Sequence, residues 1–142
     1  MKIAYLSTFY PYKGGIAQFN GSLYSALSKS HEIKAFNYKV QYPKILFPGK
    51  SQFVNDDDRA IVIESERLLN SVNPISWVKT YNEIKKFNPD IVMSKLWIPF
   101  LAPSVGYVTG RLRKSGVKAI SVLGNVIPHE HRIGDEALTK YY

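Results

Sequence analysis

The chain has 142 residues and a mass of 16.2 kDa, which suits one domain and leaves little room for two. It is 45% hydrophobic and 21% charged, so a disordered tail, a collagen-like repeat and a low-complexity segment are excluded. Because it contains no cysteine, a disulfide scaffold, a thiolate nucleophile and a cysteine-ligated metal are excluded as well.

Positive charge is in excess and is unevenly distributed. Nineteen Lys and Arg against eleven Asp and Glu give a formal net charge of +8, and residues 1–55 hold seven lysines and a single acid, Glu32. Such a surface attracts nucleic acid, anionic lipid or a phosphorylated small molecule, and charge alone does not choose among them. No run of about 18 apolar residues is present, and Ser7 and Thr8 interrupt the first apolar run too early for a signal peptide. We therefore expect a cytoplasmic protein that can sit peripherally at the inner face of the membrane.

The first quarter of the chain predicts a strand, a loop, a helix and a second strand. Residues 2–6 form a short apolar run typical of a strand buried on both faces. The loop 7–15 is rich in Pro and Gly, and apolar residues then recur at spacings of three and four over 16–27, which indicates a helix. Residues 31–38 alternate between polar and apolar and predict a partly exposed strand.

The middle of the chain predicts a long loop and two helices. Residues 39–55 have no helical period and carry two prolines and a glycine, which favours a loop. Asp56 to Asp58 form a cluster typical of a helix start or a turn, and 63–69 is predicted to be a short helix. The next helix runs over 74–87, with Asn73 as its cap, Pro at its first position, and an apolar stripe that we expect to face the core. That stripe comprises Ile75, Val78, Tyr81, Ile84 and Phe87.

The last third predicts two further strands separated by a helix. The strands cover 90–94 and 117–123, and the helix covers 98–115, with two prolines near its start. Residues 124–132 form a loop, and Asp135 is expected to cap a last helix that has no C-terminal stop signal. We therefore expect the chain to be truncated at its C-terminal end.

Apolar strands that alternate with helices are typical of an α/β fold, a Rossmann-like parallel sheet with helices on both faces. In such sheets the site lies at the carboxyl ends of the strands, which here places it in the loops 7–15, 37–55, 94–98 and 124–132.

Gly14 and Gly15 stand directly before a helix, where free backbone N–H groups favour a phosphate and glycines allow a ligand to approach the backbone. The alternative is a tight turn that needs a positive φ. The spacing matches neither G-x-G-x-x-G nor a P-loop, so a dehydrogenase or a P-loop NTPase is not expected.

The loop after the fourth predicted strand concentrates residues capable of acid–base chemistry. His129, Glu130, His131 and Arg132 are consecutive, and histidine titrates near neutral pH. The alternatives are a solvated surface loop or a metal held by the two histidines, for which no further ligands are convincingly spaced. Asp56 to Asp58 match no calcium-loop pattern and favour a solvated turn.

Aromatic and basic residues also occur together. The segment 42–48 combines aromatic, proline and lysine residues in a way that suits a membrane interface or a lipid-linked acceptor, while Trp77 is expected to pack in the core. Five cations lie late in predicted helices, where they complement the helix dipole: Lys85, Lys86, Arg111, Arg113 and Lys114.

Several segments together resemble group 1 (family 4) glycosyltransferases of the GT-B fold. These are MKIAYLSTFYPYKGGIAQFNGSLYSAL, YPKILFPGKSQ, NPISWVKTYNEIKKFNPDIV and GNVIPHE, the last three being similar to a bacterial branch of that family. The resemblance implies a retaining hexosyltransferase of cell-envelope polysaccharide biosynthesis, whose active site lies between two Rossmann-like domains. Residues 1–142 would be the acceptor-side domain, and the donor-binding domain with its E-x7-E motif is not in this sequence, so the chain alone is expected to be inactive.

The resemblance also assigns residues and ligands. Gly14 and Gly15 match the loop that approaches the donor phosphates, and the catalytic candidates are His129 and Glu130. The family usually has a histidine where this chain has Gly124, which puts the identity of any catalytic histidine in question. The expected ligands are a nucleotide-sugar and a glycan or lipid-linked acceptor, with no cofactor and no metal. Acceptor or cleft candidates are Tyr10, Lys13, Gln18, Trp97, Asn125 and His131.

The alternative is a non-catalytic Rossmann-like module that binds an anionic ligand or partner. Nucleic acid is not expected as a partner, because no nucleic-acid-binding motif and no aromatic–basic repeat is present.

Overall fold

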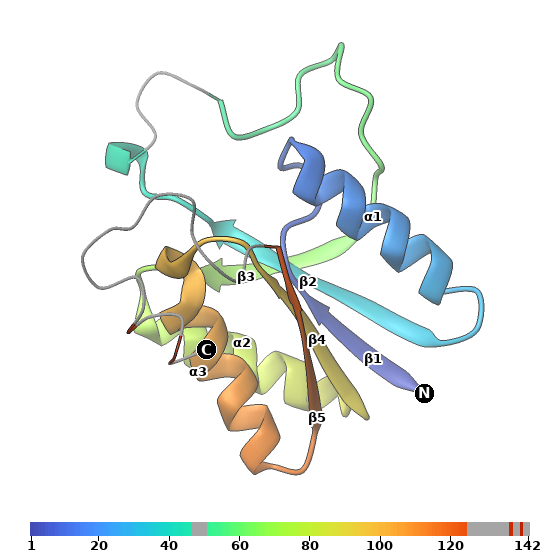
Figure 1. Cartoon of the computed structure of the whole chain (residues 1–142), viewed down its shortest axis with the longest axis vertical. Coiled ribbons are helices and arrows are strands. Elements are labelled where there is room, and N and C mark those ends of the chain that lie inside the picture. Colours follow the sequence, from blue (N-terminus) through green and yellow to red (C-terminus); the bar gives the residue numbers. More distant parts are fainter. Residues whose placement is uncertain (47–50, 125–136, 138–139, 141–142) are drawn as a thin grey trace.

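The computed structural model describes residues 1–46, 51–124, 137 and 140. Five parallel strands form one sheet in the order β3-β2-β1-β4-β5 (Figure 1), which confirms the predicted Rossmann-like α/β fold. The elements are β1 (Lys2–Leu6), α1 (Gly15–Leu27), β2 (Glu32–Val40), the 3-10 turn η1 (Lys44–Leu46), β3 (Ser65–Asn70), α2 (Pro74–Phe87), β4 (Ile91–Leu96), the 3-10 turn η2 (Pro99–Leu101), α3 (Ala102–Lys114) and β5 (Lys118–Leu123).

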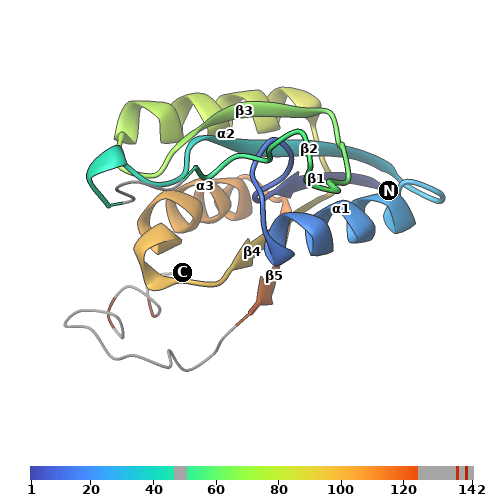
Figure 2. The same cartoon turned by 90° about the horizontal axis from the view of Figure 1, so that it is seen from above.

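Helices cover the sheet from both sides, with α1 on one face and α2 and α3 on the other (Figure 2). Successive residues of a strand point to opposite faces, so Tyr5 packs in the cluster beneath α1 while Leu6 packs beneath α2 and α3. Both side chains are fully buried. This two-sided burial explains why β1 is almost wholly apolar.

The start and end of α2 follow from local sequence. Asn73 caps it, because its side-chain oxygen accepts a hydrogen bond from Ile75 N at 3.0 Å, and Asn88 ends it in the left-handed conformation with φ 54°. The expected apolar stripe is wrong at its N-terminal end, because Ile75 is 79% exposed and Val78 is 44% exposed. Trp77 packs against the core there instead.

The expected short helix over 63–69 is wrong, because this part of the chain contains strand β3. Its hydrogen bonds go to the neighbouring strand β2, and Leu69 is completely buried in the core. The pairing of β3 with β2 shifts its register on both sides of Tyr38. These shifts interrupt the alternation of buried and exposed residues by which a strand is recognised in a sequence. Pairing with β2 therefore determines that residues 65–70 form a strand, although their local sequence pattern is ambiguous.

The predicted loop over 39–55 holds more order than expected. Strand β2 continues to Val40, and residues 51–55 lie antiparallel to the loop after β1. Lys13 N donates to Gln52 O at 3.0 Å, and Val54 N donates to Pro11 O at 2.9 Å. Of the helix expected after Asp135, the structure describes only residues 137 and 140, both of them helical, and the loop beyond Gly124 lies outside the described residues. No helix in the described part of the chain is long and apolar enough to cross a bilayer.

Candidate functional site

Two adjoining pockets open at the carboxyl ends of the strands, among the residues that the structure describes. The larger has a volume of about 490 Å³ and is lined by residues that follow β1, β2 and β4, including Thr8, Tyr42 and Trp97. The smaller, of about 370 Å³, lies on the other side of the loop after β1. Lys13 and Gly14 line both pockets, so this loop forms the wall between them.

The larger pocket lies where the strand order reverses. Strands β1 and β4 are neighbours, yet the chain leaves β1 for α1 on one face of the sheet and leaves β4 for α3 on the other. Loops that diverge in this way leave a crevice between them, which is where open α/β sheets bind ligands.

The N-terminus of α1 faces this crevice without a side-chain cap and without an acid in its first turn. Gly14 has φ 111°, a conformation that favours glycine, so the turn interpretation is correct for this residue. Gly15 is different, because a Cβ added there would meet no atom within 4 Å. Packing therefore does not require glycine at position 15. The uncapped N–H groups of the first turn can donate hydrogen bonds to an anion.

Buried amide side chains hold the loop after β1 in place. The Asn37 side chain accepts from Phe9 N at 3.2 Å and donates to Phe9 O and Tyr10 O at 3.2 and 3.0 Å. Asn20 in α1 donates to Ser7 Oγ and Thr8 O, both at 2.8 Å. Both asparagines are fully buried, so the pocket wall is a rigid part of the fold.

The far wall of the larger pocket is aromatic and polar. Trp97 Nε1 donates to Tyr42 Oη at 3.3 Å, and the Tyr42 ring stacks on Phe100 with centroids 6.2 Å apart. Thr8 Oγ1 donates to Gln41 Oε1 at 2.5 Å on the pocket floor. An apolar wall with a few placed polar groups is the usual lining of a small-molecule site.

The segment 51–55 is held over the loop by a cationic contact. The Arg67 guanidinium lies 5.5 Å from the ring centres of both Tyr12 and Phe53, and it donates from Nε to Tyr38 O at 3.2 Å. Burial raises the pKa of Tyr12, and the neighbouring Arg67 offsets only part of that effect. Tyr12 therefore stays neutral and serves as part of the wall.

The structure brings together six of the predicted site residues. Tyr10, Lys13 and Gln18 line the smaller pocket, and Lys13, Gly14, Gly15 and Trp97 line the larger one. Gly124 lies beside Trp97, since a Cβ added at Gly124 would be 3.4 Å from Trp97 Cβ. The remaining candidates lie outside the described residues: Asn125, His129, Glu130 and His131.

Sequence reasoning placed the loop 37–55 at the site but singled out none of its residues as site residues. Gln41, Ser51, Gln52 and Asn55 line the larger pocket, although no motif marks them. The general rule that sites lie at the carboxyl ends of strands pointed only to the loop 37–55, which contains all four. Among the described residues, no group of three or more His, Cys, Asp or Glu side chains is placed to hold a metal ion.

No protein-family model matches this chain, and no curated protein matches its sequence.

Proposed function

We propose that the chain is the acceptor-side half of a nucleotide-sugar-dependent glycosyltransferase with the GT-B fold. The observation that carries the proposal is the position of Gly14 and Gly15. They form the uncapped start of α1 at the edge of a pocket that also contacts the ends of β2 and β4. The resemblance of the opening segment to group 1 glycosyltransferases supports the same assignment.

The chemistry assigned to this half is electrostatic and positional. The acceptor lies in the larger pocket against Trp97 and Tyr42, and its hydroxyl oxygen attacks the anomeric carbon of a donor held by a second domain. The bond from that carbon to the diphosphate oxygen breaks, the leaving diphosphate takes the electron pair, and the proton of the acceptor hydroxyl passes to that diphosphate oxygen. N–H groups of the first turn of α1 and the Lys13 ammonium stabilise the negative charge that develops there.

The second candidate function is a binding module that uses the same pocket without catalysis. Gly124 favours it, because a histidine is usual at this position in the family that the chain resembles. Both candidates require the first turn of α1 to bind an anion, and only the first requires sugar transfer by a complete two-domain enzyme.

The experiment is a titration of the chain with UDP, GDP and inorganic pyrophosphate, followed by amide ¹H–¹⁵N spectra. We expect shifts concentrated at 13–17, and no sugar transfer by the 142-residue chain from a panel of nucleotide-sugars. Gly15→Ala should fold like the wild type, because its Cβ meets nothing within 4 Å, and should weaken the response at least fivefold. Gly110→Ala in α3 is the matched control, since its Cβ also meets nothing.

Three results would separate the candidates or contradict both. Absence of shifts at 13–17 with every probe contradicts an anion site at α1. An equal response from Gly15→Ala contradicts close approach of the ligand to the backbone at that glycine. Rapid sugar transfer by the 142-residue chain contradicts an active site divided between two domains.

A further inference from the structure

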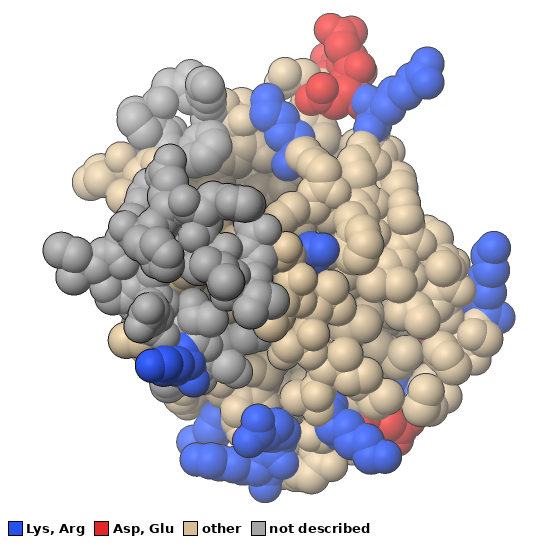
Figure 3. Space-filling view, viewed as in Figure 1, with Lys and Arg blue, Asp and Glu red and all other residues tan. Residues whose placement is uncertain are grey.

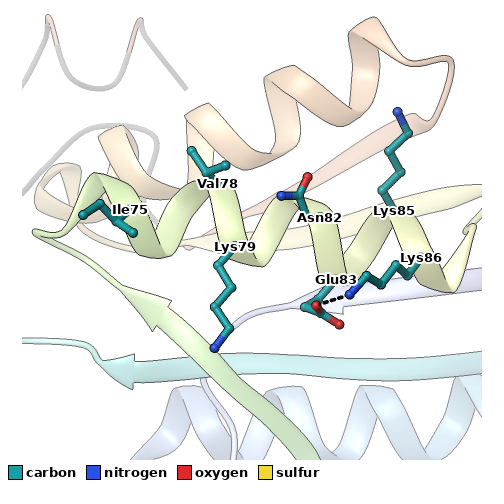
Figure 4. A pocket seen from close by; sticks show the side chains of 7 residues that line it. All are labelled: Ile75, Val78, Lys79, Asn82, Glu83, Lys85 and Lys86. Carbon is teal, nitrogen blue, oxygen red and sulfur yellow. Dashed lines mark hydrogen bonds and ion pairs between the residues drawn. The ribbon is translucent and has the colours of Figure 1, made fainter.

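Lys95 differs from every other charged residue that the structure describes, because it is buried. It lies near the carboxyl end of β4 and is 9% exposed. The lysines of α2 show the ordinary arrangement: Figure 4 shows Lys79, Lys85 and Lys86 extending from exposed positions, with Lys86 paired to Glu83 at 2.6 Å. Figure 3 likewise shows most of the Lys and Arg side chains of that face projecting at its outline. The burial of Lys95 therefore calls for a reason of its own.

The elements around Lys95 provide no counterion for its ammonium group. The strands β1, β4 and β5 and the helix α1 contain no Asp and no Glu. Their remaining cations, Lys2 and Lys118, begin β1 and β5 and so lie at the opposite end of the sheet. Tyr5 and Tyr24 are neutral, because burial raises the pKa of both hydroxyls. Burial without a counterion favours the neutral amine and lowers the pKa of Lys95.

The Lys95 amine is bordered by an aromatic ring and by aliphatic side chains that solvent reaches. On one side its Nζ atom lies 3.7 Å from the ring centre of Phe19 in α1, and Phe19 is 45% exposed. On the other side Lys95 is in register with Val122 of β5. Ile120 lies two residues before Val122, so it shares the same face of the sheet, and it is 47% exposed. A small apolar molecule could therefore reach the amine between α1 and β5.

We propose that Lys95 is a nucleophilic amine that forms an imine with a neutral aromatic aldehyde. The nitrogen lone pair attacks the carbonyl carbon, and the nitrogen gives both of its protons to the carbonyl oxygen. That oxygen leaves as water while the C=N bond forms. The ring of the aldehyde then packs on Phe19 and against the aliphatic side chains of β5. The imine is neutral, so the product needs no counterion in this apolar place.

The surroundings of Lys95 favour an aromatic aldehyde over an anionic ligand. An anion held there would lose its hydration and gain one amine among apolar groups, which leaves most of its oxygens without a donor. An aldehyde gives up its oxygen as water, and an aromatic ring matches the face of Phe19. Lys95 lines neither of the two pockets at the strand ends, as the structure describes them, so the proposal does not depend on the proposed function.

The experiment treats the 142-residue chain with benzaldehyde or 2-methylpropanal at neutral pH and traps imines with cyanoborohydride. Peptide mass spectrometry then gives the rate of modification at each lysine, and Lys39, exposed on β2, is the internal reference. We expect benzaldehyde to modify Lys95 at least about tenfold faster than Lys39, because the neutral amine becomes about tenfold more abundant for each unit by which a lysine pKa falls. In urea the two lysines should be modified equally, since the excess depends on the fold.

Phe19→Leu tests recognition of the aldehyde by the ring. It should lower the preference of Lys95 for benzaldehyde over 2-methylpropanal about threefold, the worth of one aromatic pair, and comparing two aldehydes cancels any change in the amine itself. The matched control is Phe53→Leu, which removes another partly exposed ring, packed on Tyr12, and should leave the preference unchanged. Modification of Lys95 no faster than that of Lys39, or an excess that persists in urea, would overturn the nucleophilic amine. An unchanged preference in Phe19→Leu would overturn recognition of an aromatic aldehyde.

Discussion

The Nζ atom of Lys95 lies 3.7 Å from the centre of the Phe19 ring. Lys95 is near the carboxyl end of β4 and is only 9% exposed, and its ammonium group has neither an ion pair nor a hydrogen bond with any described residue. Its neighbour across the strand pair is Val122, which packs against the apolar cluster beneath α1, and the ammonium group lies over a ring face. Burial lowers the pKa of Lys95, because the charged form loses its hydration.

Replacing Lys95 with methionine should stabilise the protein. Methionine keeps the length of the side chain and removes a charge whose desolvation the Phe19 ring offsets only in part. We expect the free energy of unfolding in urea to rise by about 1–2 kcal/mol. Lys39→Met at an exposed position is the control and should stay within about 0.5 kcal/mol of wild type. A loss of stability in Lys95→Met would mean that the ammonium group has a stabilising partner.

The stability gap between Lys95→Met and the wild type should depend on pH. The pKa of Lys95 is lower in the folded state than in the unfolded chain, so the folded state binds fewer protons in the alkaline range. The penalty for the buried charge is complete below the folded-state pKa and disappears as pH rises toward 10.5, the ordinary lysine value. Urea titrations between pH 7 and 10.5 should therefore show the gap closing, and a constant gap would contradict this assignment.

Replacing Asn37 with alanine should destabilise the protein and loosen the pocket wall. Its amide bonds both backbone groups of Phe9, and removal leaves the buried Phe9 N–H without that partner, while Phe9 O keeps its hydrogen bond from Tyr12 N. We expect a loss of about 2–4 kcal/mol in the free energy of unfolding. Asn82→Ala, at an exposed position on α2, should change it by less than about 0.5 kcal/mol. Similar values for the two variants would show that Asn37 does not hold the loop.

Gly21 and Gly110 are both helical glycines and should respond oppositely to alanine. A Cβ at Gly21 would lie 2.9 Å from Ile61 Cβ, closer than packed carbons allow, while one at Gly110 would meet nothing. We expect Gly21→Ala to cost about 1–3 kcal/mol and Gly110→Ala to stabilise by up to about 1 kcal/mol. Thermal unfolding of both variants checks this, and stabilisation of Gly21→Ala would contradict the close packing of Ile61 on α1.

Much of the fold could be predicted because the strong local signals agree with the tertiary structure. The run 2–6 is apolar because both faces of β1 are covered, and Asn73 with Pro74 marks the start of α2. The predictions failed where contacts with other elements of the fold determine the local structure or its burial. Residues 65–70 carry a mixed pattern that only pairing with β2 makes a strand, and Ile75 and Val78 fit a helical stripe that faces solvent.

The candidate site likewise has one part that local sequence signals predict and another part that they do not. Local sequence signals predict that Gly14 and Gly15 stand directly before a helix at the carboxyl end of the first strand, because strand, loop and helix are contiguous, and α1 begins at Gly15. Only the tertiary structure placed Gln41, Gln52 and Trp97 in one pocket with them. The physical reason is that strand order and the return of 51–55 over the loop depend on contacts between residues distant in sequence. The same reason applies to Lys95, whose burial follows from the packing of Phe19 over β4 and not from any pattern in its own strand.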